Sequence, residues 1–422
     1  MNFLNSFSNL RRNAGVLSFT WSQIGEDING GWDTDYAGWS VSMNYTGNII
    51  AFSLVQSERP GGAASEGEVR VLQWNGTAWT QMGVDIYGEA GLDQSGYSIS
   101  MNAAGDRIAI GAIFNDGTSG STTDNRGHTR IYQWNGTAWT QMGVDIDGEA
   151  ADDQSGYSVS MNAAGDRVAI SAKLNDGTSG STTDNRGHVR VFQWNGTAWT
   201  QMGVDIDGET TYDQSGHSIS INAAGNRVAI GSWSNESTGL DRGHTRIYQW
   251  NGTAWTQMGV DIDGESSQDK SGYSVSINAA GNRVAIGAIA NLNGGYYNGH
   301  VRVFEWNGTA WTRMGVDIDW TDVYGDTQVG WSVSMNLAGD RVAIGANLAD
   351  AFGQNSGAVR IYSWNGSAWS QLGAQIRGEA AFDQSGYSVS MNAAGDRVVI
   401  GAPLNNSSGF TDSGHVRVYQ LF

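Results

Sequence analysis

The stretch QWNGTAWTQMGVDIDGEAADDQSGYSVSMNAAGDRVAI, residues 133–170, returns with few changes at residues 193–230. Each copy is marked by a tryptophan, which follows an Asn-Gly turn in all copies but the first. The copies begin at Trp21, Trp79, Trp139, Trp199, Trp255, Trp311 and Trp369. Self-similarity at a fixed period indicates a repeat architecture in which each copy is one supersecondary unit. The chain therefore consists of repeated copies of one unit rather than of several unrelated domains.

Each copy predicts four antiparallel strands. In the third copy, residues 157–162 (YSVSMN) alternate apolar and polar, and the turn AAGD joins them to residues 167–172 (RVAISA), which indicates a hairpin. Residues 188–194 (HVRVFQW) and 199–206 (WTQMGVDI) flank the turn NGTA and indicate a second hairpin, whose flanking tryptophans should pair and fix the register. No window shows the period of an amphipathic helix, so we expect an all-β protein.

A four-stranded sheet with two apolar faces needs cover on both sides, and radial stacking of like sheets supplies it. The last copy ends at residues 414–422, one strand short, whereas residues 16–24 supply an extra strand of the missing kind. We therefore predict a seven-bladed β-propeller of four-stranded antiparallel blades, closed by pairing of the N-terminal strand with the C-terminal strand. In this interpretation residues 1–14 form an N-terminal tail, and residues 15–422 form a single propeller.

Composition and charge narrow the classes of partner. The chain has 60 Gly and 2 Pro, no cysteine, and a formal net charge of −19, and its only lysines are Lys173 and Lys270. A surface this acidic would repel a phosphate backbone, so we expect no nucleic-acid partner. No apolar run is long enough to cross a bilayer, so we also expect no membrane insertion. The oligomeric state stays open.

Residues 385–406 (SGYSVSMNAAGDRVVIGAPLNN) carry a resemblance to a known family. The glycine and aromatic at Gly386 and Tyr387 and the Gly-Ala-Pro at residues 401–403 resemble the FG-GAP repeat of integrin-type propellers. The resemblance implies a seven-bladed propeller used for adhesion or recognition, on a cell or virion surface, commonly with calcium in loops of the form Asp-x-Asp-x-Asp-Gly. At the position of that loop, this chain has the short turn NAAGDR.

One histidine recurs in five copies, one residue after a glycine and two before an arginine. One such residue per blade is held far from the next, so we expect the imidazoles to make hydrogen bonds inside their blades rather than to share one metal. The recurring aspartates that precede the SGY-type motif are the expected acceptors for the histidine or arginine. This structural set is His128, His188, His244, His300, His415, Asp93, Asp153, Asp213, Asp269 and Asp383.

Acidic residues cluster in the loops that read DIDGE. Carboxylates at this density favour calcium as one candidate, and plain solvated turn acids as the alternative. The last copy reads QIRGE and places Arg377 in the loop, so no cofactor is required by every blade. The candidate calcium ligands are Asp145, Asp147, Glu149, Asp205, Asp207, Glu209, Asp261, Asp263 and Glu265.

The variable loops, on the face opposite the short AAGD and NGTA turns, are the expected binding surface, because sites lie on loops held by a rigid scaffold. The candidate ligand-binding residues are the aromatics there that do not recur in every copy: Trp32, Trp233, Tyr296, Tyr297, Trp320, Phe352 and Phe410. We predict a non-enzymatic binding or adhesion module whose partner is a protein or glycan on a surface. The alternatives are a glycan-binding lectin and, less favoured because no catalytic motif is present, a glycoside hydrolase with carboxylates at the axis.

Overall fold

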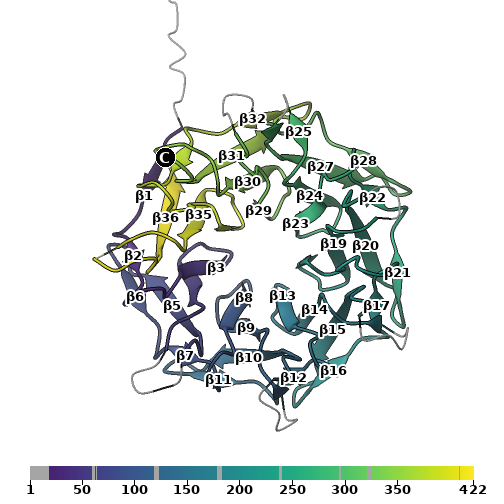
Figure 1. The fold of residues 1–422 in the computed structure, drawn as a ribbon, viewed down its shortest axis with the longest axis horizontal. Helices are drawn as coiled ribbons and strands as arrows, with labels where there is room; N and C mark the ends of the chain where they lie inside the picture. The colour runs from purple at the N-terminus through teal and green to yellow at the C-terminus, as the bar shows by residue number, and fades with distance from the viewer. Residues whose placement is uncertain are drawn as a thin grey trace, which may run out of the picture.

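Seven β-sheets surround a central axis, and together they form a seven-bladed propeller (Figure 1). The computed structural model describes residues 19–58, 62, 64–117, 123–177, 183–236, 240–293, 296–320, 325–407 and 409–422. The predicted tail, the first residues of the predicted N-terminal strand and the middle of several variable loops lie outside these described residues. All elements in the described part of the chain are β-strands, which confirms the predicted fold class.

Each blade repeats the same order from the axis outward. The inner strands are β3 (Ala37–Met43), β8 (Ser95–Met101), β13 (Ser155–Met161), β18 (Ser218–Ile221), β23 (Ser271–Ile277), β29 (Ser332–Met335) and β34 (Ser388–Met391). The second strands are β4 (Ile49–Leu54), β9 (Arg107–Ala112), β14 (Arg167–Ala172), β19 (Arg227–Ser232), β24 (Arg283–Ala288), β30 (Arg341–Ala346) and β35 (Arg397–Ala402). The ends of the inner strands alternate between more and less buried residues, as the sequence pattern predicts, whereas the second strands are buried along almost their whole length.

The outer half of each blade is the second predicted hairpin. The third strands are β5 (Glu68–Trp74), β10 (His128–Trp134), β15 (His188–Trp194), β20 (His244–Trp250), β27 (His300–Trp306), β31 (Ala358–Trp364) and β36 (His415–Leu421). The fourth strands are β6 (Trp79–Gln81), β11 (Trp139–Gln141), β16 (Trp199–Gln201), β21 (Trp255–Gln257), β28 (Trp311–Arg313), β32 (Trp369–Gln371) and β1 (Trp21–Gln23). In six blades the two tryptophans of this hairpin pair, with ring centroids 5.3–5.4 Å apart, as predicted.

Short segments extend the fourth strands toward the variable-loop face, where each pairs with the start of the third strand of its own blade. They are β7 (Ile86–Tyr87), β12 (Ile146–Asp147), β17 (Ile206–Asp207), β22 (Ile262–Asp263), β33 (Ile376–Arg377) and β2 (Ile28–Asn29). A separate hairpin of β25 (Leu292–Asn293) and β26 (Tyr296–Tyr297) lies in one variable loop. After each short segment the chain crosses to the inner strand of the next blade.

The ring closes through both ends of the chain, as predicted. Strand β1 pairs antiparallel with β36, with Trp21 opposite Leu421, so the N-terminal strand completes the blade of the last three strands. In Figure 1 the purple β1 lies beside the yellow β36. Because of this pairing, the blade at the seam has a fourth strand like the other blades. It contains residues from both ends of the chain.

Contacts between blades hold the ring together. The indole Nε1 of each fourth-strand tryptophan donates to a backbone carbonyl of the preceding blade, at 2.7–3.0 Å, in a closed circle of seven bonds. The hydrophobic clusters also span neighbouring blades: Ile131 of one blade packs with Val168 and Ile170 of the next. The core is therefore a set of apolar layers between sheets, as expected for sheets that are apolar on both faces.

Candidate functional site

Seven aromatic side chains, one from the start of each inner strand, form a closed circle around the axis. Neighbouring ring centroids lie 4.5–5.6 Å apart. Its members are Trp39, Tyr97, Tyr157, His217, Tyr273, Trp331 and Tyr387. This circle was not predicted, although the sequence carries a signal for it: an aromatic or histidine follows a glycine at the same position of every copy.

The glycine before each of these aromatics lets the inner strand approach its neighbour. Gly156, which precedes Tyr157, has a φ of +88°, and a Cβ there would lie 2.5 Å from the carbonyl oxygen of His128. Only glycine adopts this conformation at this distance without strain. The strand is also irregular here, since its pairing with β14 shifts between Ser155 and Val159. The bulge turns the aromatic side chain toward the axis.

The only two lysines of the chain lie beside this circle. The Nζ of Lys173 is 3.7 Å from the ring centroid of Tyr157, and the Nζ of Lys270 is 4.8 Å from that of Trp233. Burial lowers the pKa of Lys173 to about 8. Burial and the two nearby ammonium groups lower the pKa of His217 to about 3, so its imidazole is neutral at pH 7. Trp233, a predicted ligand residue, is half-buried against His217, with ring centroids 5.8 Å apart.

A pocket lies on the variable-loop face beside the seam of the ring, and we name it the closure pocket. It has a volume of about 560 Å³ and is lined among others by Trp32, Asp33, Gln56, Glu58 and Phe410. The rings of Trp32 and Phe410, both predicted ligand residues, lie 5.8 Å apart at 60° to each other. Trp32 is 66 % exposed. The structure thus brings together two aromatics that are far apart in the sequence.

Backbone hydrogen bonds fix the walls of the closure pocket. The amides of Gly31 and Trp32 donate to the carboxylate of Asp35 at 2.7 and 2.8 Å. The amide of Thr411 donates to Asp33 Oδ1 at 2.7 Å, and the amide of Thr34 donates to the carbonyl of Thr411 at 2.8 Å. Burial raises the pKa of Asp35. These bonds tie together the two loops, from adjacent blades, that carry Trp32 and Phe410.

The remaining predicted ligand residues are distributed elsewhere. Tyr296 and Tyr297 are 48 % and 42 % exposed, and Tyr297 lines a second pocket of about 310 Å³ together with Lys270 and Asp326. Phe352 is exposed and lines neither pocket. Trp320 corrects the sequence interpretation: it is fully buried, with the guanidinium of Arg360 4.2 Å from its ring centroid, and so presents no surface to a ligand.

The recurring aspartates have a different partner from the expected one. Asp153 accepts hydrogen bonds from the amides of Glu149 and Ala150 and from the side chain of Asn175, at 2.9–3.2 Å. Burial raises the pKa of Asp153. The expected pairing with His188 is absent from these bonds, because Asp153 lies in the crossing segment and caps its own loop. Asp93, Asp213, Asp269 and Asp383 accept from the equivalent amides.

The buried histidines instead face carboxylates from two DIDGE-type loops. Asp145 lies before β12 and points to His128 of its own blade, with the Oδ2 atom 3.8 Å from Nδ1. Glu149 lies after β12, in the crossing segment, and its Oε2 is 3.9 Å from Nδ1 of His188 in the next blade. Consequently the acids predicted to surround one calcium ion are divided between neighbouring blades. The side chain of Asp147 belongs to neither group of three.

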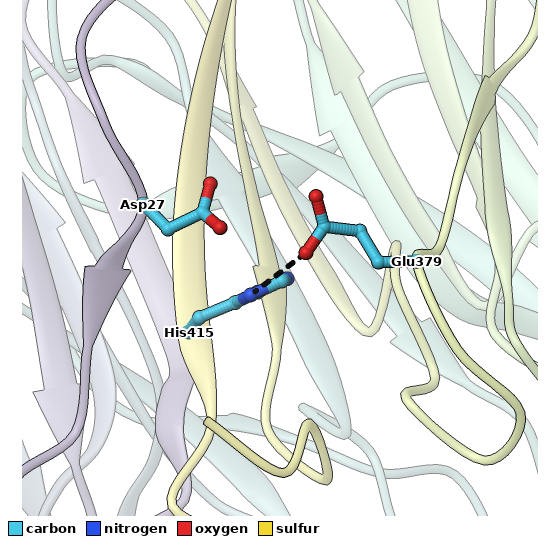
Figure 2. Close-up of side chains that lie close together, drawn as sticks. All are labelled: Asp27, Glu379 and His415. Atoms are coloured by element: carbon cyan, nitrogen blue, oxygen red, sulfur yellow. Dashed lines mark ion pairs between the residues drawn. The ribbon is translucent and has the colours of Figure 1, made fainter. Parts of the chain in front are cut away.

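We name these groups the junction clusters; each contains one histidine and two carboxylates with ligand atoms within 4.8 Å of one another. They are Glu89–His128–Asp145, Glu149–His188–Asp205, Glu209–His244–Asp261, Glu265–His300–Asp317 and Asp27–Glu379–His415. Figure 2 shows the last of these, in which the carboxylates of Asp27 and Glu379 point toward each other and toward His415. Burial, helped by the neighbouring arginine, lowers the pKa of His128 and of His188 to about 4.

No known protein family model matches this chain, and no curated protein of similar sequence is found. The seven-bladed architecture is the part of the expected likeness to FG-GAP propellers that the structure bears out. Within the described residues, no helix has the length and apolar character needed to cross a bilayer.

Proposed function

We propose that the protein is a non-enzymatic binding module and that it recognises a glycan in the closure pocket. The observation that carries the proposal is the pairing of exposed Trp32 with Phe410 over a pocket of about 560 Å³. Aromatic faces beside hydrogen-bonding groups suit a sugar ring, which has an apolar face and a polar edge. The resemblance to FG-GAP propellers supports a role in adhesion at a cell or virion surface.

Charge and shape favour a neutral or cationic sugar over a flat protein partner. Asp33 and Glu58 line the pocket beside Gln56, and the chain as a whole carries a formal net charge of −19. Acidic sugars would be repelled at this surface. The pocket is concave, and the loops that carry Trp32 and Phe410 are tied together, which reduces the entropy lost when a small group binds between them.

Glycan-array screening followed by titration calorimetry tests the proposal. We expect binding of a neutral or amino sugar, and Trp32→Ala and Phe410→Ala should each weaken it about tenfold or more, equivalent to roughly 1–3 kcal/mol for an aromatic anchor. Phe352→Ala is the matched control, because Phe352 is as exposed as Trp32 but lies outside the pocket. This change should leave the affinity for the glycan unchanged.

Two results would contradict the proposal. The first is the absence of any glycan ligand, or a ligand whose affinity is insensitive to Trp32 and Phe410. The second is cleavage of the bound glycan, detected by mass spectrometry after incubation, because a binding module returns its ligand intact.

A further inference from the structure

Each junction cluster contains a deeply buried imidazole that is aimed at carboxylates. His128, His188 and His244 are at most 1 % exposed, and among the described residues neither ring nitrogen of any of the three has a hydrogen-bond partner. Leaving a buried polar group unpaired destabilises the folded protein. The same arrangement occurs at several junctions, so it is a property of the repeat rather than a local irregularity of one blade.

The distances suit groups that a small cation would draw together. Across the clusters, Nδ1 of the histidine lies 3.7–4.0 Å from the nearest oxygens of its carboxylates, beyond hydrogen-bond length. A tetrahedral Zn²⁺ with bonds of about 2.0–2.2 Å holds its ligand atoms roughly 3.3 Å apart. Closing this gap needs a shift of about half an ångström. Glu149 and Asp205 are 45 % and 31 % exposed and can move by that amount, while His188 stays fixed.

The arginine of each third strand orients the glutamate. Arg190 Nη1 lies 3.6 Å from Glu149 Oε1, on the opposite oxygen from the one that faces His188. The Nη2 atom of the same guanidinium donates to the carbonyl of Asp147 at 2.6 Å. Such outer contacts, which fix the direction of a ligand, are characteristic of metal sites in proteins.

We propose that the junction clusters are binding sites for a divalent transition metal, with Zn²⁺ as the best chemical match, and that the metal ties one blade to the next. A set of one imidazole and two carboxylates suits zinc, which takes nitrogen and oxygen ligands and keeps a further position for water. Calcium prefers six to eight oxygen ligands, and imidazole is not among them. The sites thus use six of the nine acids expected to bind calcium, but in a different grouping and with an imidazole among the ligands.

One cluster contains an obstruction. The fourth strands of the other six blades end in glutamine, whereas β28 ends in Arg313. Its guanidinium forms ion pairs with Glu265 and with Asp317. It therefore engages both acids of the Glu265–His300–Asp317 group, while a third carboxylate, that of Asp319, lies 3.9 Å from Nδ1 of His300. A guanidinium and a divalent cation repel each other at this separation. Of the five clusters that the described part of the chain contains, the four without this obstruction take metal.

The two junctions without the histidine are filled by other means. Glu68 stands at the histidine position in the blade of β3 to β6 and forms an ion pair with Arg70. Ala358 stands there in the blade of β31, and Trp320 packs in the same hydrophobic cluster as Ala358. At these two junctions, other side chains therefore fill the place that a histidine and two acids occupy elsewhere.

The cluster at the seam has an added consequence. Asp27 comes from the N-terminal strand region, His415 from the C-terminal strand β36, and Glu379 from the preceding crossing segment (Figure 2). A metal bound there joins both ends of the chain to the neighbouring blade. Because an ion that binds only the folded state stabilises it by mass action, the closed ring becomes more stable as the metal concentration rises.

Equilibrium dialysis of the full chain against Zn²⁺ tests the proposal, with excess Mg²⁺ present to occupy unspecific surface acids and bound metal measured by mass spectrometry. We expect about four Zn²⁺ per wild-type chain, the number of unobstructed clusters within the described residues. Glu149→Gln, which preserves shape, and His188→Ala should each remove one ion. Glu236→Gln is the control, because this exposed acid lies outside every cluster, and should remove none.

Arg313→Gln supplies a gain-of-binding test, since glutamine stands at this position in neighbouring blades. It should raise the number of bound ions by one. Replacing Zn²⁺ by Co²⁺ should give a visible absorption band that weakens by about one quarter in Glu149→Gln, which shows that the lost ion had its own site.

Four outcomes would overturn the proposal. They are no Zn²⁺ retained by the wild-type chain, the same number of ions in Glu149→Gln and His188→Ala as in wild type, no added ion in Arg313→Gln, and displacement of Zn²⁺ by an equal concentration of Ca²⁺. The measurement needs no glycan, so its failure is independent of the failure of the proposed function.

Discussion

His217 stands where four other copies of the repeat have tyrosine. It is the member of the aromatic circle whose side chain titrates at acidic pH. Its pKa lies near 3 in the folded protein, against an ordinary value of 6.5. Burial is the main cause, and Lys173 and Lys270 add to it. Between these two pKa values the unfolded chain binds a proton that the folded protein does not. The free energy of unfolding therefore falls as the pH falls from 6.5 toward 3.

We predict that His217→Tyr weakens this pH dependence. Relative to wild type, the variant should lose about 1–2 kcal/mol less of its free energy of unfolding between pH 7 and pH 5, because the proton uptake of one histidine is removed. Urea unfolding at the two pH values provides the measurement. Tyr273→Phe, a change in the same circle without a group that titrates in this range, should keep the wild-type pH dependence. An identical pH dependence in His217→Tyr and wild type would contradict the assignment.

At the scale of elements, the seam depends on a strand of three residues. β1 covers the edge of β36 and also places Trp21, whose indole donates to the carbonyl of Leu372 at 2.7 Å. Without β1, the third strand of this blade would present unpaired amides and carbonyls to solvent, which is a template for aggregation.

Deleting residues 1–26 should therefore cause self-association or a large drop in melting temperature. Size-exclusion chromatography with light scattering and a thermal melt measure the two effects. Deleting only residues 1–18 retains β1 and is the control, which should behave as wild type. A chain without residues 1–26 that stayed monomeric and melted at the wild-type temperature would show that β1 does not protect the edge.

At the scale of the whole molecule, a closed ring has no terminal blade. The indole bonds at the seam and inside the ring are equivalent in kind: Trp21 donates at 2.7 Å and Trp199 at 2.9 Å. In an open stack the end units would fray first, because they have one neighbour instead of two.

We predict that Trp21→Phe and Trp199→Phe lower the free energy of unfolding by similar amounts, each about 0.5–1.5 kcal/mol for one hydrogen bond, plus a comparable change in packing. Chemical denaturation measures both. A much smaller effect for Trp21→Phe, with an early partial unfolding transition, would indicate that the seam opens independently of the ring.

The sequence alone determined the repeat, the two hairpins of each blade and the completion of one blade by β1, because these depend on local alternation, on Asn-Gly turns and on the number of strands in each copy. It also predicted that Trp32 and Phe410 belong to a recognition surface, but it could not show that they share a pocket. Residues at the two ends of the chain meet only when the ring closes.

Only the tertiary structure decided the partners of the acidic and aromatic residues. Asp145 and Glu149 are near neighbours in sequence, yet they face histidines of different blades, since the segment between them crosses a junction. In the same way, Tyr157 meets Tyr97 and His217 from copies on either side. The physical reason is that a repeat specifies its own sheet through local patterns, while contacts between repeats depend on the angle at which rigid sheets stack around the axis.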